Sequence, residues 1–443
     1  MGINLKSILK KKLQNDREQN IFYLTAIIHI IKYCFNKNFR KKRCLIDPPA
    51  SFFYKYRKLV NYFTIPLLIF ARFLEKKKIF ISVNNEHNYS MGHIHVEIDY
   101  LQRKQHFEEK YSDSIIWFTT SRKEILGDTK HIFESKNFKI LFGGIKRIFL
   151  TFVAIKHPSI SINGGISHAN HILGRDNSNR IVFHNMRQRH SKMITKSAGF
   201  YLQKDKLKDY YEETKNLLEM LNITKKYVVI QIKTEKVNAT FEILSPDSLL
   251  KSIKYFQDKD YQIVFAGREK FPDIFLNKSI IDYANSKYAS ALNDFLIIGH
   301  SSLVIASASG FCHLVEILDK PLIICNTSAG PGYSGRRTIV LPTLLSRRSE
   351  KFNAIIQHKY LCTYHTNFGS DIYDDLYLLH ITNSEEIYMA AKELESGMLS
   401  EAISSLTPLQ KEIRDGEGCP LLSCGLSRIS DYYLKNHGYF FRK

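Results

Sequence analysis

The sequence predicts an α/β protein with two units, each a parallel sheet covered by helices. The length of 443 residues exceeds that of one ordinary domain. Short β-branched runs alternate with amphipathic stretches over residues 79–205, and the same alternation returns over 224–400. A charged stretch at 206–223 predicts a helix that connects the two units. We therefore expect two Rossmann-like lobes that face a central cleft, because open parallel sheets bind ligands beyond the carboxyl ends of their strands.

The composition excludes several other classes of protein. Hydrophobic residues make up 44% of the chain and charged residues 24%, which is the balance of a globular protein and not of a disordered chain. The 21 Gly and 11 Pro are too few for a collagen-like chain. The seven Cys are odd in number and scattered, which indicates reduced thiols in a cytoplasmic protein rather than a disulfide framework or a zinc site.

Residues 1–78 form a separate basic segment. They contain 18 Lys and Arg against 4 Asp and Glu, a net charge of +14, whereas the other 365 residues carry only +7. Apolar residues between 24 and 35 recur at helical spacing and predict one apolar helix face. We expect a basic helical extension that lies on the inner membrane surface. The alternative is a helical extension that packs on its own domain, and no nucleic-acid partner is expected because no such motif is present.

The first unit, residues 79–205, begins with a strand at Ile79–Val83. An amphipathic helix follows at 93–106, then a strand at Ile115–Thr120 and a strand end at Ile160–Ile162. A charged helix is expected over the wider range 201–223, and it leads into the second unit.

The second unit, residues 224–400, repeats the alternation. Its strands are expected at 227–233, 261–265, 303–306 and 321–325, and its helices at 247–256 and 311–318. Residues 401–443 are expected to form a C-terminal helical tail.

The sharpest local feature is the stretch 303–326. A strand runs into Ser307-Ala308-Ser309-Gly310, and a helix follows. Small residues let the backbone approach a ligand, and the free N–H groups of a helix start favour a phosphate. Glu316, further along this helix, is placed to reach ribose hydroxyls. The alternative is that Ser309 simply caps the helix and that the small residues serve packing.

Residues Tyr210–Met398 resemble bacterial glycosyltransferases that are encoded in surface-polysaccharide gene clusters, those for O-antigen and capsule. The matching elements, in chain order, are DYYEETKNLLEMLNI, KKYVVIQIK, SIIDYANSKYASALNDFLIIGHSSLVIASASG and HITNSEEIYMAAKELESGM. The upstream MGHIHVEID also fits the first lobe of this family. The resemblance covers about two thirds of the chain and implies a GT-B-type fold, with a nucleotide-sugar donor held mainly by the C-terminal lobe.

The resemblance implies roles for particular residues. The expected donor-binding residues are Lys233, Arg268, Ser307, Ser309, Gly310, His313 and Glu316. The sequence departs from the family at Gln231-Ile232-Lys233, where an HxR-like strand end is usual, so Lys233 can meet a phosphate only as a point charge. For the acceptor, we expect His93 as the catalytic base, with Glu86 and Glu97 as its rivals.

Neither a metal ion nor a cofactor is expected. The sequence has no convincing DxD element, so cationic side chains and a helix N-terminus must offset the charge of the leaving diphosphate. Arg268 is one candidate for this role, and Arg336 and Arg337 in PGYSGRR are others.

The sequence thus predicts a glycosyltransferase that is peripheral on the inner membrane and uses a lipid-linked, lipopolysaccharide or capsule glycan as acceptor. Two alternatives remain open. One is a nucleotide-sugar epimerase of the same fold. The other is a non-catalytic subunit of a polysaccharide assembly complex.

Overall fold

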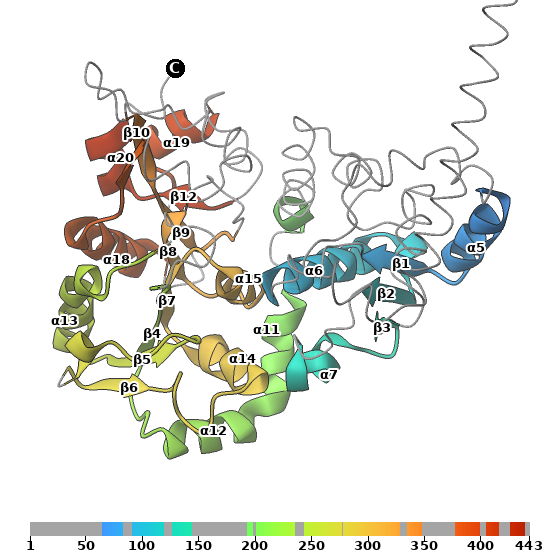
Figure 1. Cartoon of the computed structure of the whole chain (residues 1–443), viewed down its shortest axis with the longest axis horizontal. Helices are drawn as coiled ribbons and strands as arrows, with labels where there is room; N and C mark the ends of the chain where they lie inside the picture. The colour runs from blue at the N-terminus through green and yellow to red at the C-terminus, as the bar shows by residue number, and fades with distance from the viewer. Residues whose placement is uncertain are drawn as a thin grey trace, which may run out of the picture.

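The chain is described by a computed structural model over eleven ranges. These are 64–82, 91–118, 126–143, 193–197, 201–234, 243–276, 278–327, 335–347, 377–398, 405–415 and 426–438. Within them, two separate parallel sheets form, one of three strands and one of seven, together with an antiparallel pair. Figure 1 shows the seven-stranded sheet on the left and the three-stranded sheet on the right. None of the helices in the described ranges combines the length and apolar character that crossing a membrane requires.

The three-stranded sheet has the order β1-β2-β3, and all its strands are parallel. The strands are β1 (Ile79–Ser82), β2 (Ser114–Phe118) and β3 (Phe138–Phe142). The helix α6 (Met91–Phe107) connects β1 to β2, and α5 (Thr64–Lys76) packs beside β1. The expected first two strands and the helix between them are confirmed to within two residues. The strand β3 was not expected, and the expected strand end at 160–162 lies outside the described residues.

The seven-stranded sheet has the order β12-β9-β8-β7-β4-β5-β6, and it is parallel throughout. Its strands are β4 (Tyr227–Gln231), β5 (Gln262–Ala266), β6 (Ile280–Asp282), β7 (Leu303–Ser307), β8 (Leu322–Thr327), β9 (Thr338–Pro342) and β12 (Arg428–Ile429). The antiparallel pair joins β10 (Leu344–Arg347) to β11 (Tyr377–His380). All four strands expected in the second unit are confirmed.

Helices lie between the strands of the larger sheet and after its last strand. They are α13 (Leu250–Asp258), α14 (Ala291–His300), α15 (Gly310–Ile317), α18 (Ser384–Met398), α19 (Pro408–Asp415) and α20 (Asp431–His437), and short 3-10 turns lie at Pro246–Leu249 and Asp273–Phe275. The expected helices at 247–256 and 311–318 correspond to α13 with its preceding turn and to α15. The expected C-terminal tail is not wholly helical, because β12 pairs with β9 and joins the sheet.

The charged stretch before the second unit is not one continuous α-helix, as the sequence predicted. It forms α11 (Leu202–Lys206), a 3-10 turn at Leu207–Tyr210 and α12 (Tyr211–Met220). The side chain of Leu207 is buried in this turn, and it lies where a Cβ on Gly299 of α14 would be. The tighter winding of the 3-10 turn thus coincides with close packing between the connector and α14.

The order of the larger sheet contains a reversal that matters for ligand binding. The chain enters at β4 and builds β5 and β6 on one side, then returns to place β7, β8 and β9 on the other side. The topological switch point therefore lies at the paired strands β4 and β7, and both strands end at the same edge of the sheet because they are parallel.

The two sheets are joined through packed helices. The helix α6 of the smaller sheet contacts α15 of the larger one. One hydrophobic cluster includes buried residues from both, among them Ile94, Ile98, Cys312 and Val315. The described residues therefore meet by direct packing at α6 and α15. The expected domain boundaries and the expected central cleft stay predictions.

Candidate functional site at the switch point

The ends of β4 and β7 are held together by side chains at the switch point. The Ser307 Oγ accepts a hydrogen bond from the backbone N–H of Lys233, at 3.0 Å. Ser309 Oγ donates to Gln231 Oε1 at 3.3 Å. Ser307 is fully buried, so its hydroxyl fixes the spacing of the two chain segments where they leave the sheet. The structure thus brings Lys233, Ser307 and Ser309 to the same edge of the sheet, and their role in donor binding stays a prediction.

The turn that follows β7 leads directly into α15. Ser309 is the N-cap residue, with an extended backbone at φ −159° and ψ 173°, but its side chain makes no capping hydrogen bond. The alternative interpretation, in which the Ser309 hydroxyl caps α15, is therefore not the arrangement observed. Backbone N–H groups at a helix start carry partial positive charge and favour an anion.

The end of β5 lies on the other side of β4. Gly267 has φ +110°, and a Cβ there would lie 3.0 Å from Cγ of Gln231, so both the backbone conformation and the space favour glycine. Arg268 follows with an exposed side chain. A cationic side chain therefore stands at the carboxyl end of β5, next to the switch point.

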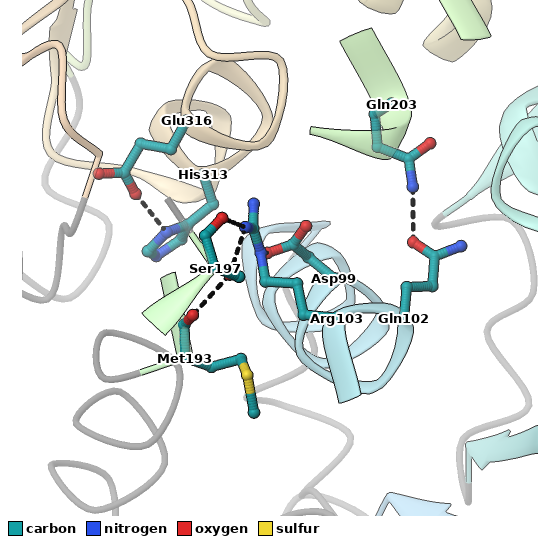
Figure 2. Close-up of polar contacts among 8 residues, drawn as sticks. All are labelled: Asp99, Gln102, Arg103, Met193, Ser197, Gln203, His313 and Glu316. Atoms are coloured by element: carbon teal, nitrogen blue, oxygen red, sulfur yellow. Dashed lines mark hydrogen bonds and ion pairs between the residues drawn. The ribbon is translucent and has the colours of Figure 1, made fainter. Parts of the chain in front are cut away.

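His313 and Glu316 lie on the buried side of α15, as Figure 2 shows. The His313 Nδ1 is 3.3 Å from Glu316 Oε2. Glu316 Oε1 accepts the backbone N–H of Gly335 at 2.7 Å and lies 3.5 Å from the Thr338 hydroxyl. This carboxylate therefore ties α15 to the start of β9, and a ribose-binding role for Glu316 stays a prediction.

Two of the expected acceptor-side residues lie on α6, and Glu86 lies outside the described residues. His93 is in the first turn of the helix, and its side chain is outside the described residues. Glu97 is buried, and its carboxylate accepts a hydrogen bond from the hydroxyl of Ser82, the last residue of β1. Glu97 is thus fixed at the carboxyl edge of the smaller sheet, and an acceptor-side role for it stays a prediction.

The sequence analysis missed His95, which is buried where α6 approaches α15. Its ring centroid lies 5.0 Å from that of Phe133, and its exposed fraction is 2%. Burial is the main cause that lowers the pKa of His95 to about 3, with the nearby His313 acting in the same direction and Asp99 in the opposite one. His95 is therefore neutral at physiological pH. Within the described part of the chain, its Nδ1 has no hydrogen-bond partner.

A second missed group is centred on Arg103, whose side chain is 1% exposed. Figure 2 shows its guanidinium beside Asp99 and Ser197. The Nε lies 2.7 Å from Asp99 Oδ2, and one terminal nitrogen donates to Ser197 Oγ at 2.8 Å. The helical spacing of His95, Asp99 and Arg103, four residues apart each time, is the signal that could have identified this polar stripe.

Tyr201 connects this stripe to the larger sheet. The guanidinium carbon of Arg103 lies 5.2 Å from the centre of the Tyr201 ring, and that of Arg336 lies 5.1 Å from it. Burial is the main cause that raises the pKa of Tyr201, and the carboxylate of Asp319 adds to it. Two cationic side chains therefore lie against one aromatic ring. Arg103 comes from α6, beside the smaller sheet, and Arg336 from the segment before β9 of the larger sheet.

The structure places Arg336 away from the expected phosphate loop. Its guanidinium makes two hydrogen bonds to Asp319, at 2.9 and 2.5 Å, and Arg337 donates to the Asp319 carbonyl at 3.0 Å. Asp319 follows the last turn of α15, whereas Ser309 precedes the first. An eight-residue helix spans roughly 12 Å, so these arginines lie at the far end of α15 from the switch point.

In the described ranges, no three His, Cys, Asp or Glu side chains gather in a way that could hold a metal ion. Metal independence stays a prediction. Cys312 and Cys325 are buried free thiols.

No protein-family model matches the chain. No curated protein matches it either. Among solved structures, E. coli ADP-heptose lps heptosyltransferase II is 11% identical with a TM-score of 0.38, covering 60% of this chain and 90% of that one. A glycosyl transferase of family 9 from Veillonella parvula is 12% identical with a TM-score of 0.38, covering 72% and 97%.

A UDP-GlcNAc 2-epimerase from Neisseria meningitidis bound to UDP-GlcNAc is also similar. It is 10% identical with a TM-score of 0.30, covering 56% of this chain and 81% of that one. Because these identities are low and every TM-score is below 0.5, the similarities assign neither a residue nor an activity to this chain.

Proposed function

We propose that this protein is a GT-B-type glycosyltransferase that binds a nucleotide-sugar donor at the switch point of its seven-stranded sheet. One observation carries the proposal: the chain leaves the paired strands β4 and β7 toward opposite sides of the sheet, and β7 leads through Ser307–Gly310 into the N-terminus of α15. A crevice at a switch point is the general ligand site of open parallel sheets. The resemblance of residues 210–398 to surface-polysaccharide glycosyltransferases supports the same activity.

In this proposal the diphosphate of the donor lies against the backbone of Ser309 and Gly310. The partial positive charge at the start of α15 offsets the charge that develops on the leaving group. Lys233 and Arg268, at the ends of β4 and β5, supply cationic charge on the neighbouring side. His313 and Glu316 lie next along α15 and orient the nucleoside, and neither a metal nor a cofactor is required.

The acceptor approaches from the side of α6. His93, in its first turn, is proposed as the base that takes the proton of the acceptor hydroxyl, with Glu97 as the alternative. Glu97 already accepts a hydrogen bond from Ser82, which leaves its carboxylate less free to move. The proposed acceptor is a lipid-linked, lipopolysaccharide or capsule glycan, and the proposed location is the cytoplasmic face of the inner membrane.

The proposal is tested by incubating the full chain with a panel of nucleotide sugars and measuring nucleotide release with and without a glycolipid acceptor. Release that depends on the acceptor supports glycosyl transfer. Conversion of the sugar without acceptor would instead identify an epimerase. Tight nucleotide-sugar binding without turnover on any acceptor would favour a non-catalytic subunit.

A further inference from the structure

The helix α5 has two different faces. It packs beside β1 at the edge of the smaller sheet, and Figure 1 shows it at the end of the molecule remote from the seven-stranded sheet. Its inward side chains, Ala71 and Leu74, are each 1% exposed. Its outward face carries two large apolar side chains, because Ile69 is 66% exposed and Phe73 is 51% exposed. The helix is thus anchored on one side and presents apolar surface on the other.

Basic side chains share this outward face. Ile69, Arg72, Phe73 and Lys76 are spaced by three, four and seven residues, which places them in one stripe. Glu75, the helix's acidic residue, borders this stripe three residues after Arg72. Within the described ranges, Arg72 and Lys76 make no ion pair, and both side chains are exposed. A stripe that alternates large apolar with basic side chains is typical of helices that lie in a membrane interface.

We infer that α5 binds the surface of an anionic lipid bilayer through the face formed by Ile69, Arg72, Phe73 and Lys76. Ile69 and Phe73 enter the boundary between headgroups and acyl chains, and Arg72 and Lys76 meet the lipid phosphates. Two other occupants are disfavoured by charge. Residues 1–63 carry 14 Lys and Arg against 3 Asp and Glu, so this segment has the same sign as the face it would cover. A second copy of the face would bring like charges together.

This inference does not require the proposed function, but it adds a geometry to it. The helix α5 ends at Lys76, two residues before β1 begins, and Ser82, the hydrogen-bond partner of Glu97, is the last of the four residues of β1. At about 3.3 Å per residue, the three steps from Ile79 to Ser82 span roughly 10 Å. A bilayer under α5 would therefore lie close to the edge of the smaller sheet from which a lipid-linked acceptor is proposed to enter.

The first experiment measures insertion directly. Phe73→Trp is introduced into the full chain, and its fluorescence is followed with vesicles of phosphatidylglycerol whose acyl chains carry bromine, a contact quencher. The matched control is Tyr211→Trp, because Tyr211 is an aromatic residue 63% exposed on α12. The single native Trp117 gives the same background in both variants. We expect quenching for Phe73→Trp beyond the control. Equal quenching in the two variants would overturn the inference.

The second experiment measures affinity by vesicle sedimentation. Ile69→Ser with Phe73→Ser removes two exposed apolar side chains, and Tyr211→Ser with Met220→Ser removes two elsewhere. Arg72→Gln with Lys76→Gln lowers the charge by two, as does the control Lys215→Gln with Lys226→Gln. We expect each α5 pair to weaken binding to phosphatidylglycerol vesicles by roughly tenfold, and each control pair by much less.

Three results would contradict this assignment of the face. The first is unchanged vesicle binding in both α5 variants. The second is a change of oligomeric state in Ile69→Ser with Phe73→Ser at unchanged vesicle binding, which would identify a contact between copies. The third is equal binding to vesicles of neutral phosphatidylcholine, because the inference requires anionic lipid. Failure of these tests leaves the nucleotide-sugar proposal intact, since donor binding is measured without lipid.

Discussion

Replacing Arg103 with methionine should strongly destabilise the packing of the two sheets. Arg103 is 1% exposed, and its Nε lies 2.7 Å from the carboxylate of Asp99, which is 4% exposed. Methionine keeps the length of the side chain but removes the charge. The Asp99 carboxylate would then remain buried without its guanidinium partner, and the Ser197 hydroxyl would lose a donor. The stacking of the guanidinium on Tyr201 would also be lost.

The magnitude follows from the burial of the pair. Removing one partner of a buried ion pair costs about 3–5 kcal/mol, because the remaining charge is left desolvated. For a unit of about 200 residues, this corresponds to a fall of roughly 6–20 °C in the unfolding midpoint. The double variant Asp99→Leu with Arg103→Met removes both charges and leaves apolar side chains of similar volume. It should be more stable than Arg103→Met alone.

The assay is thermal unfolding of the full chain, with Lys208→Met as the matched control. Lys208 is also paired with an aspartate on a helix, but both side chains are largely exposed, at 79% and 70%. An exposed pair contributes at most about 1 kcal/mol, so the control should unfold near the wild-type temperature. The reasoning would be refuted by an Arg103→Met protein as stable as the control, or by a double variant less stable than the single one.

Two further predictions concern the packing around the site. The pKa of His95 is lowered from 6.5 to about 3, so the unfolded chain binds the proton more readily and stability should be lost as the pH falls below 6.5. By about pH 5 this loss of unfolding free energy amounts to roughly 2 kcal/mol. The variant His95→Phe should abolish the loss, whereas substitution of the exposed His106 should not. Parallel profiles of stability against pH in the two variants would contradict this. In Gly299→Ala, the added Cβ would lie 2.5 Å from a methyl carbon of Leu207, so we expect a loss of about 1–3 kcal/mol. The loss of stability in Leu207→Ala should be partly rescued by Gly299→Ala. Strictly additive changes in the thermal unfolding midpoint would show that the two residues are not in contact.

Local sequence patterns predicted those strands and helices that can be recognised from their own residues alone. The strands at 227–231 and 303–307 are short apolar runs followed by small or polar residues, and the helix after Gly310 has an apolar face. Strand β12 is different. It has only two residues, Arg428 and Ile429, and it is a strand only because it pairs with β9 almost 90 residues earlier. No local pattern identifies such a partner.

The difference between local patterns and contacts of distant residues also explains which parts of the candidate site were predictable. The loop at Ser307–Gly310 was predictable because strand, small-residue turn and helix follow one another in the chain. The contact between α6 and α15 joins residues about 200 positions apart, so the sequence did not show that His95 would lie near His313. Arg336 was misplaced for a similar reason, because its partner Asp319 follows α15 rather than the phosphate loop.

The most direct test of the central claim is the equilibrium binding of nucleotide sugars to the full chain and to Gly310→Val, measured by isothermal titration calorimetry. A valine at the start of α15 would occupy the space where the donor phosphate approaches the backbone. Gly438→Val is the control, because a Cβ there has room, with its nearest contact at 3.9 Å. We expect one nucleotide class to bind the wild type and the control, and affinity to fall well over tenfold in Gly310→Val, since charge-assisted hydrogen bonds of roughly 1.5–3 kcal/mol each are at stake. A folded Gly310→Val protein that binds its nucleotide sugar like the wild type would place the donor elsewhere.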